Sequence, residues 1–494
     1  MEKNEYVVAI DLGTSKVVTL VGRKGAGGKA EVLAGSVSDS LSGVARGEIK
    51  NTEHVLKALK ETIENIENEL GIGIKEAYVG ISGQHIKCSR HSGYIFIENN
   101  DNEVRPKDVQ RLNESMHNVQ VPVGETIIHI LPQKYTVDGE SDISEPVGVI
   151  GKKLEASFNI ITGDRNAIIR VDKCLSRLSV NVSQHILNPL ASAEAVLVPD
   201  EKELGVAVVD IGGGTTDVCI YHDNIVRHVG IVPLGGNIVN KDIRSYGILE
   251  RHVENLKVKF GSAVGELERP DKFITIPGLN ARDPKEISFR NLASIIEARM
   301  LDIIDCVNLE IRKSGYQNRL GAGIVLTGGC AKLRNLDVLF RRHTGQEVRV
   351  AVPENHITAE SLELVNSPAY ATAVGLLLKA INAGVTMYVE NQPKAAAATT
   401  GAATAVAGGT VNDRYAGAGS GSRQTGGQGR YRSGYGRKDA APGAAEQQAQ
   451  AAEEPENDTA FEEAEEQPAP RRKGVFGRLV DKFNNMFEVI DDDI

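Results

Sequence analysis

The sequence predicts an α/β fold made of two similar halves and followed by a long low-complexity segment. Within residues 1–390, apolar segments with strand character alternate with segments of helical spacing, which is typical of α/β architecture. An apolar strand, an Asp-x-Gly turn and a second apolar strand occur together at residues 7–18, and the same unit returns at residues 206–218. The composition then changes near Asn391, where we expect the packed body to end.

Composition and charge narrow the classes of function. The formal net charge is −10, whereas a general nucleic-acid binder carries a basic face, so no nucleic-acid partner is expected. The five cysteines are widely spaced and form no C-x-x-C pair, which argues against a disulfide framework and a zinc site. No run of 18 or more apolar residues occurs, and the N-terminus lacks the features of a signal peptide. We therefore expect a cytoplasmic protein without a membrane-spanning helix.

Hydrophobic periodicity predicts the elements in order along the two halves. Apolar residues recur every three or four positions through residues 54–70 and 292–311, which predicts a helix in each segment. Short apolar runs bounded by turn residues predict strands. The expected strands are residues 6–10, 17–22, 77–81, 86–88, 94–97, 204–209, 218–221 and 323–326.

The segment after the body has the composition of a linker. Residues 393–438 are mostly Ala, Gly, Thr and Ser with scattered Arg, and residues 439–470 are rich in Glu. Neither stretch can bury enough apolar surface to offset the entropy of ordering the chain. We therefore predict a disordered linker over residues 391–473, with a mean reach of roughly 50 Å if it behaves as a flexible coil.

The two repeated turns carry the residue types of a phosphate site. They are Asp11, Gly13, Thr14, Ser15 and Lys16 in the first half, and Asp210, Gly212, Gly213, Gly214, Thr215 and Thr216 in the second. Glycines let backbone N–H groups approach phosphate oxygens, the hydroxyls add donors, and Lys16 supplies a positive charge. Asp11 and Asp210 are expected to face each other across a cleft and to hold a hydrated Mg²⁺, which takes oxygen ligands. One such turn alone is more often an ordinary glycine-rich hairpin, but two copies, one in each half, favour a nucleotide site.

Two further features fit the other end of a nucleotide. Gly328 and Gly329 follow an apolar strand and precede an expected helix start, where a flat base or ribose can lie against the backbone. Glu254 and Lys257 lie three residues apart, on one face of an expected helix over residues 250–260. The alternative for this pair is a solvated surface ion pair, which contributes little.

Taken together, the motifs resemble those of the actin-like ATPase superfamily and, within it, the FtsA family of bacterial cell-division proteins. The closer match rests on residues 79–86, 93–95, 189–197, 256–263 and 371–376. Two positions depart from the family pattern, because Asn240 stands where Thr is usual and Cys330 where a third Gly is expected.

The resemblance implies an actin-like (ribonuclease H-like) two-domain fold around a cleft that binds ATP and Mg²⁺. The first domain would contain residues 1–81 and 166–200, with a subdomain inserted at residues 82–165. The second domain would contain residues 201–390, with its smaller subdomain at about residues 245–305. Relatives that hydrolyse ATP briskly carry a Gln or Glu near position 188, whereas this chain has the shorter Asn188, so slow or negligible turnover is expected.

The resemblance also implies a function: an adaptor that tethers a ring of the tubulin-like protein FtsZ to the membrane. The implied partners are FtsZ, further copies of this chain in filaments, other divisome proteins and lipids at the cytoplasmic face of the cell membrane, at the division septum. The alternatives are a pilus-assembly (PilM-like) protein and a rod-shape scaffold of the same superfamily. The long linker and the segment at residues 80–165 argue against a rod-shape scaffold, and the final helix argues against a pilus-assembly protein.

The last segment, residues 474–490, predicts an amphipathic helix that binds the membrane peripherally. At 100° per residue its apolar side chains fall within an arc of roughly 140°. They are Val475, Phe476, Leu479, Val480, Phe483, Met486, Phe487 and Ile490. Three basic residues at 471–473 lead into the segment, which suits an anionic headgroup layer. The alternative is a helix that docks on this protein or on a partner.

Overall fold

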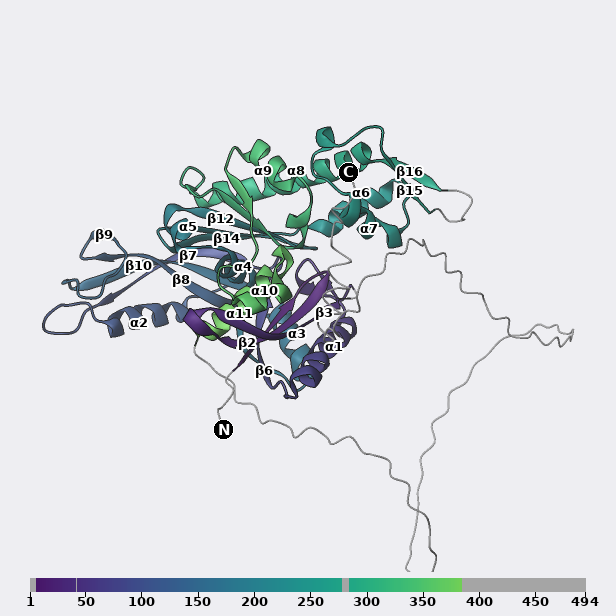
Figure 1. The fold of residues 1–494 in the computed structure, drawn as a ribbon. Coiled ribbons are helices and arrows are strands. Elements are labelled where there is room, and N and C mark those ends of the chain that lie inside the picture. Colours follow the sequence, from purple (N-terminus) through teal and green to yellow (C-terminus); the bar gives the residue numbers. More distant parts are fainter. Residues whose placement is uncertain (1–5, 41, 278–283, 384–494) are drawn as a thin grey trace, which may run out of the picture. The chain divides into compact units, whose positions relative to one another are not determined.

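The computed structural model describes residues 6–40, 42–277 and 284–383, all of which belong to one compact unit (Figure 1). The linker predicted at residues 391–473 and the helix predicted at 474–490 lie outside the described residues.

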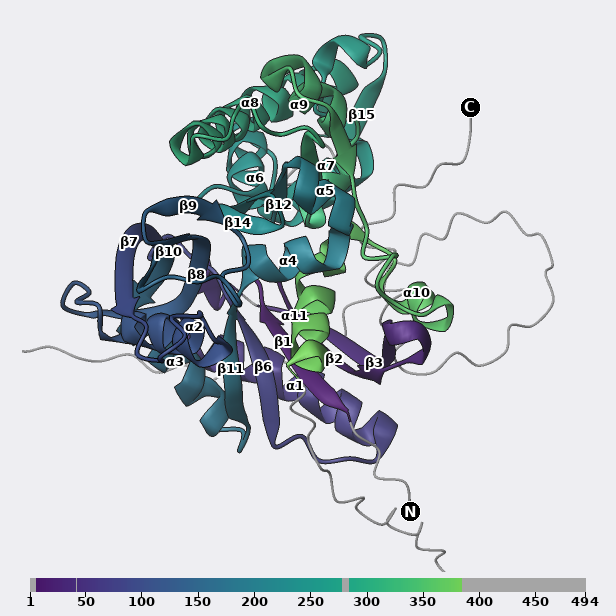
Figure 2. The same ribbon diagram turned by 90° about the vertical axis from the view of Figure 1, so that its left-hand side faces the viewer.

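The first half is built on a five-stranded sheet in the order β11-β6-β1-β2-β3. Neighbouring strands β1, β2 and β3 are antiparallel, whereas β6 and β11 run parallel to β1. Helix α1 packs on one face of this sheet and helix α11 on the other, so alternate residues of β1 enter different core clusters (Figure 2). The elements are β1 (Val7–Leu12), β2 (Lys16–Lys24), β3 (Ala30–Asp39), α1 (Thr52–Leu70), β6 (Glu76–Ile81), α3 (Arg165–Ser176), β11 (Asn181–Leu187) and α11 (Ala371–Asn382).

The second half repeats this topology in the order β14-β13-β12-β17-β18. Strands β12, β13 and β14 are antiparallel, and β17 and β18 run parallel to β12, so the repeat seen in the sequence is a repeat of the fold. Its strands are β12 (Val206–Ile211), β13 (Thr216–His222), β14 (Ile225–Val232), β17 (Ile324–Thr327) and β18 (Val348–Val350). Its helices include α5 (Pro199–Leu204), α6 (Gly236–Ser245), α7 (Glu250–Phe260), α8 (Phe289–Ser314) and α9 (Leu336–Thr344).

Two helices lie between the sheets and join the halves. Helix α4 (Asn188–Val196) packs closely against α11, and both contribute to a core cluster that also contains residues of β1 and β12 (Figure 2). Their approach is so close that a Cβ atom at Gly375 would lie 1.8 Å from the carbonyl oxygen of Ala191. Glycine is therefore required where the two helices meet.

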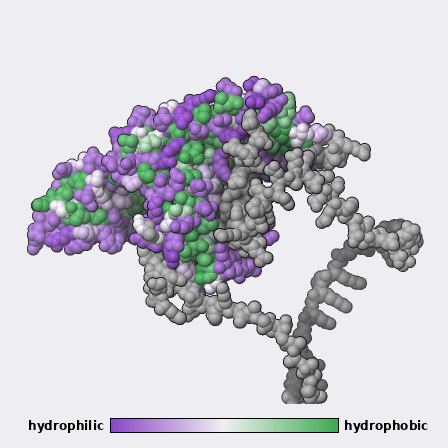
Figure 3. Space-filling model, viewed as in Figure 1, coloured by the Kyte–Doolittle hydropathy of each residue, from purple (hydrophilic) through white to green (hydrophobic). Residues whose placement is uncertain are grey.

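A smaller antiparallel sheet in the order β7-β10-β8-β9 is inserted between β6 and α3. It carries helix α2 against one face over its own small core, which includes Leu112, Met116 and Phe158. Its elements are β7 (Lys87–Phe96), α2 (Pro106–Ser115), β8 (Glu125–Val137), β9 (Glu140–Ile143) and β10 (Lys153–Asp164). Exposed apolar side chains of this subdomain include Tyr94, Phe96, Val147 and Ile150, and Figure 3 shows apolar residues gathered at its outer end on an otherwise mostly hydrophilic face.

Two boundaries predicted from the sequence were wrong. The separate strands expected at residues 86–88 and 94–97 are one strand, β7, because polar residues between them alternate outward from a sheet with one exposed face. The strand expected to begin at Leu204 begins at Val206, because Leu204 ends α5 and Gly205 turns the chain with φ +100°. The helices expected at 54–70 and 292–311 are confirmed as α1 and α8.

Among the described residues no single helix is both long and apolar enough to span a membrane. Only α10 (Ala359–Val365) and the segment Pro368–Asn382 meet that requirement, and only together, as a pair bent by 94°.

Candidate functional site

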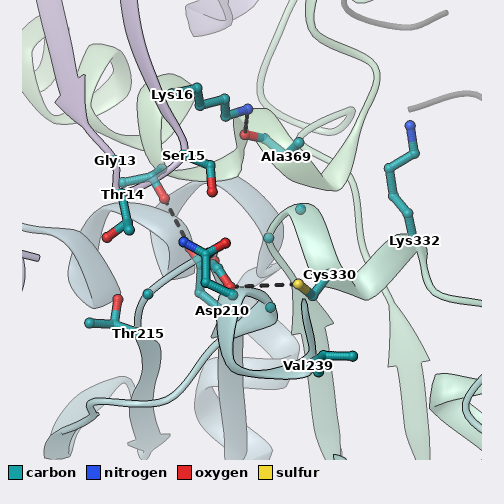
Figure 4. A pocket seen from close by; sticks show the side chains of 18 of the residues that line it. Gly13, Thr14, Ser15, Lys16, Asp210, Thr215, Val239, Cys330, Lys332 and Ala369 are labelled. Carbon is teal, nitrogen blue, oxygen red and sulfur yellow. Dashed lines mark hydrogen bonds between the residues drawn. The ribbon is translucent and has the colours of Figure 1, made fainter. Parts of the chain in front are cut away.

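A deep pocket lies where the two sheets meet, and both Asp-x-Gly turns line it (Figure 4). The structure brings nearly all of the nucleotide-binding residues predicted from the sequence to this pocket. They are Asp11, Gly13, Thr14, Ser15, Lys16, Asp210, Gly212, Gly213, Gly214, Thr215, Glu254, Lys257, Gly328 and Gly329.

Thr216 is the exception. It is fully buried at the start of β13, and its hydroxyl donates a hydrogen bond to the carbonyl of Leu234 at 2.9 Å. Successive side chains of a strand point to opposite faces, so Thr216 faces away from the pocket that Thr215 and Asp217 line. The prediction of a phosphate-binding hydroxyl at Thr216 is therefore wrong.

Hydrogen bonds to neighbouring residues and close backbone packing at Gly13 hold the first turn in place. A Cβ atom at Gly13 would lie 2.7 Å from the carbonyl oxygen of Lys16, so only glycine fits this turn. Ser40 donates a hydrogen bond to the carbonyl of Thr14, and the amide of Gly47 donates to the Thr14 hydroxyl at 3.4 Å. The turn is therefore fixed by the chain that follows β3.

The second turn is fixed by the start of α6. The amides of Gly236 and Asn237 donate to the carbonyls of Gly212 and Gly213, at 2.9 and 2.8 Å. A Cβ atom at Gly213 would lie 2.0 Å from the Ser15 hydroxyl oxygen, so the two turns touch each other across the pocket. This contact brings the hydroxyls of one half next to the backbone amides of the other.

Three buried carboxylates surround the turns: Asp11, Asp210 and Asp217. Asp210 accepts hydrogen bonds from Ser192 and from Thr372, the latter at 2.9 Å. Burial raises the pKa of Asp11 to about 7, an effect that the charge of Lys16 partly offsets. Burial, together with the nearby charge of Asp210, raises the pKa of Asp217 to about 8. Burial thus makes these carboxyl groups costly to ionise, and a cation bound beside them would favour their charged forms.

Asp217 is one of the pocket residues that the sequence prediction omitted. It lies directly opposite Asp210 in the β12–β13 pairing and accepts a hydrogen bond from Ser82 at 2.9 Å. The signal was present in the sequence, because Asp217 ends the Asp-x-Gly-Gly-Gly-Thr-x-Asp motif of the second half.

Lys16 supplies the positive charge at the first turn. Its ammonium group donates a hydrogen bond to the carbonyl of Ala369 (Figure 4) and lies 4.4 Å from the centre of the Tyr370 ring. Burial lowers the pKa of Lys16 to about 8, although Asp11 and Asp210 act in the opposite direction. The segment just before α11 therefore sets where this charge lies.

The other end of the pocket combines one buried ion pair with apolar side chains. Lys257 is buried and donates to the carbonyl of Gly236 at 3.2 Å and to Glu254 at 2.9 Å, so the alternative of a solvated surface pair is wrong for Lys257. Asn240 also donates to Glu254. Cys330 lies against the carbonyl of Gly212 at 3.6 Å (Figure 4). The apolar lining residues are Val239, Val258, Met300 and Leu333.

These residues fit a nucleotide and a hydrated divalent cation. The glycines of the two turns let phosphate oxygens approach the backbone, and the hydroxyl groups of these turns and the charge of Lys16 can bind them. The apolar end of the pocket suits a base. The buried oxygen of the Asn188 side chain, which also lines the pocket, has no hydrogen-bond partner among the described residues. No group of three or more acidic, His or Cys residues in the described chain could hold a metal on its own. A cation here would need water and phosphate oxygens to complete its shell, as Mg²⁺ usually does.

Comparisons with known proteins agree with this arrangement. The family model "Cell division protein FtsA" matches residues 207–375, and the model "SHS2 domain inserted in FTSA" matches residues 83–162, which contain the small sheet except for the end of β10. FtsA of Pseudomonas aeruginosa is 34% identical over 405 residues, covering 80% of this chain and 96% of that protein. FtsA of Escherichia coli K12 is 34% identical over 381 residues, covering 76% of this chain and 90% of that protein.

A solved structure supports the fold independently. The PilM–PilN type IV pilus biogenesis complex gives a TM-score of 0.55 at 15% identity, covering 76% of this chain and 98% of that one, which shows the actin-like fold alone. Two repeated halves around a pocket, an inserted subdomain and 34% identity over most of a relative's length all point to one family. The chain belongs to the FtsA family of bacterial cell-division proteins.

Proposed function

We propose that this chain binds ATP with Mg²⁺ in the pocket and acts in cell division as a filament-forming adaptor. In this role it binds FtsZ, tethers the FtsZ ring to the cytoplasmic face of the cell membrane at the septum, and helps other division proteins assemble. The observation that carries the nucleotide part is the meeting of two Asp-x-Gly turns and Lys16 around one pocket. The cell-division part rests on membership of the FtsA family.

Each part of the pocket has a distinct task in this proposal. The turn amides and the hydroxyls of Thr14, Ser15 and Thr215 bind the phosphates, and Lys16 offsets their charge. Asp11 and Asp210 hold the hydrated Mg²⁺, which neutralises phosphate charge when bound. Glu254 and Lys257 bind the ribose, and the backbone at Gly328 and Gly329 lies against the base.

The nucleotide is expected to act as a switch more than as a substrate. The candidate side chain for orienting the attacking water is Asn188, which lines the pocket and is one methylene shorter than Gln. We therefore expect turnover far below the usual enzyme range of about 1–10³ s⁻¹. The measurement is phosphate release by the purified chain, and a rate in that range that co-purifies with the protein would contradict the proposal.

The nucleotide proposal is tested by thermal unfolding with and without ATP and Mg²⁺. A ligand that binds the folded state at 100 times its Kd stabilises it by about 2.7 kcal/mol, so saturating ATP should raise the melting temperature by several degrees. Asp210→Asn keeps the size of the side chain and removes its charge, and should abolish most of this shift.

The matched control is Asp200→Asn, because Asp200 is exposed and lies outside the pocket. A wild-type chain that shows no shift with ATP would exclude the site. An Asp210→Asn variant that keeps the full shift would exclude the metal role. GTP and a panel of sugars in parallel would decide the ligand class.

The tethering proposal is tested with FtsZ and lipid vesicles. We expect FtsZ to sediment with vesicles only when this chain is added, because the linker and the final segment would connect the two. The matched sample is the chain ending at Lys473, which should still bind FtsZ and leave it in the supernatant. FtsZ that never sediments with the full chain and vesicles would contradict the adaptor function.

A further inference from the structure

The inserted subdomain contacts both halves of the molecule, although the chain leaves and re-enters only the first half. It starts after β6 and ends before α3, both of which belong to the first half. Its strands β7 and β8 nevertheless lie beside β14, the edge strand of the second sheet (Figures 1 and 2). The contact is therefore a tertiary one between segments far apart in the sequence.

The contact with the second half consists of buried side-chain bonds to the edge of β14. The Gln133 amide donates to the carbonyl of Val226 at 2.8 Å, and the Asn159 amide donates to the carbonyl of Arg227 at 2.9 Å. Gln133 is 7% exposed and Asn159 is 3% exposed. Backbone carbonyls of an edge strand are normally satisfied by water, so two buried amides that replace the water make this contact specific.

Charged groups reinforce the same contact. The guanidinium of Arg227 is buried and donates to the Gln133 side-chain oxygen at 3.4 Å and to Asp223 at 3.1 Å. Lys134 of the inserted subdomain forms an ion pair with Asp223 at 3.4 Å. Breaking this contact would leave Arg227 buried with fewer partners, which is costly.

Strand β14 leads to the start of α6, which holds the second phosphate turn. It ends at Val232, and the next turn presents the amide of Gly236 to the carbonyl of Gly212. Within β14, Ile231 lies opposite Asp217 of β13, and Asp217 accepts the bond from Ser82, the residue that follows β6 where the insertion begins. One strand thus connects the contact at Val226 with the pocket.

The contact with the first half also reaches the pocket. His129 of β8 accepts a hydrogen bond from the amide of Leu187 at 3.1 Å. Leu187 precedes Asn188, which lines the pocket at the start of α4. In each half, the inserted subdomain therefore bonds to a segment that leads to the pocket.

We infer that the inserted subdomain is a clamp across the nucleotide cleft, holding the two halves together and changing its own stability when nucleotide binds. The coupling part of this inference rests on the proposed ATP site, whereas the clamp itself rests only on the bonds described above. If ATP binds more tightly to one arrangement of the two halves, it also stabilises the bonds that the inserted subdomain makes in that arrangement. The coupling is reciprocal, so those bonds in turn strengthen ATP binding.

The experiment compares hydrogen exchange in the wild-type chain and in the double variant Gln133→Met, Asn159→Leu. These substitutions keep the approximate side-chain size and remove both amide donors to β14. The matched control is Asn118→Leu, Gln120→Met, which makes the same changes at exposed positions of the same subdomain. The nucleotide-free samples test the clamp, and samples with ATP and Mg²⁺ test the coupling.

Without nucleotide, the double variant should exchange amides of residues 225–232 about 25-fold faster than the control, because each of the two lost bonds changes an opening equilibrium by roughly fivefold. With ATP, the wild type and the control should gain protection in residues 87–96 and 153–164, and the double variant should not. If the double variant does not fold, Asn159→Leu alone gives the same comparison with a smaller effect.

Equal exchange in the double variant and the control would overturn the clamp. A wild-type chain that shows an ATP melting shift without added protection in the inserted subdomain would overturn the coupling while leaving the ATP site intact. A wild-type chain without any ATP shift would overturn the proposed ATP site and the coupling, and the nucleotide-free comparison would still decide on the clamp.

Discussion

At the scale of single residues, two adjacent threonines are expected to have different roles: Thr215 contributes to ATP binding and Thr216 to stability. Thr215 lines the pocket, whereas the hydroxyl of Thr216 is used in a buried bond to Leu234. Thr216→Val should lower the free energy of unfolding by about 1 kcal/mol and leave ATP affinity unchanged. Thr215→Val should do the reverse, weakening ATP binding several-fold with little loss of stability.

Denaturant unfolding and ATP titration of the two variants measure these effects, and each variant is the control for the other. If the ATP affinity falls only in the Thr216→Val variant, then Thr216 and not Thr215 is the phosphate donor, which contradicts this assignment.

A second residue, His129, predicts how stability depends on pH. Burial lowers the pKa of His129 to about 4, and the charges of Lys379 and His185 act in the same direction. The unfolded chain, with a pKa near 6.5, therefore binds more protons than the folded chain between about pH 4 and pH 6.5. This contribution to stability is complete above pH 6.5 and is lost as the pH falls towards 4.

The expected loss from this group at pH 5 is about 1–2 kcal/mol relative to pH 7. His129→Gln removes the titrating group, so its free energy of unfolding should fall less steeply over that interval, although it starts from a lower value at pH 7. Urea unfolding at pH 7, 6 and 5 provides the measurement. Parallel curves for the variant and the wild type would mean that His129 does not titrate as the structure requires.

At the scale of elements, the crossing of α4 and α11 joins the two halves and permits no added side chain. A Cβ atom at Gly375 would lie 1.8 Å from the carbonyl oxygen of Ala191, and the backbone of α4 cannot move without moving Asn188 and Ser192. Gly375→Ala should cost about 1–3 kcal/mol of stability or more, as overpacking of a core does.

The control for this substitution is Gly73→Ala, because a Cβ atom there would meet nothing within 4 Å. Thermal unfolding of both variants is the measurement. We also expect Gly375→Ala to weaken ATP binding, because Ser192 on α4 bonds to Asp210. A Gly375→Ala variant as stable as the control would show that the helices can separate at little cost.

At the scale of the whole molecule, we expect membrane affinity to come from residues 475–490 and little from the body. The reason is the apolar arc of that segment, since burying one large apolar side chain is worth about 1.5–3 kcal/mol. Phe483→Glu with Phe487→Glu should release the chain from lipid vesicles. Asn484→Glu with Asn485→Glu adds the same charge outside the arc and should have a much smaller effect.

Vesicle co-sedimentation of both double variants, the wild type and a chain ending at Lys473 makes the comparison. Binding should weaken only modestly with salt, because screening acts on the basic residues and not on the apolar arc. A truncated chain that sediments as well as the wild type would place the anchor elsewhere. A wild-type chain that stays in the supernatant would favour the alternative that this segment docks on a partner.

The sequence alone was sufficient for the fold class and for most of the pocket. The two Asp-x-Gly turns are local signals, because the residues that shape each turn are consecutive in the chain. Helical periodicity likewise predicted α1 and α8, since an amphipathic pattern over many residues reports which face is buried. The fold class, the turns and the long helices can therefore be predicted from residues that are close together in the sequence.

Only the tertiary structure could decide the features that depend on long-range pairing. The burial of Lys257 required α6 and α7 to come together, and the place of Lys16 required Ala369, which is more than 350 residues away. Thr216 and Asp217 acquired opposite roles because strand pairing decides which side of β13 faces the pocket. The contact between the inserted subdomain and β14 joins residues that are far apart in the sequence. No sequence pattern links them, because they become neighbours only when the chain folds.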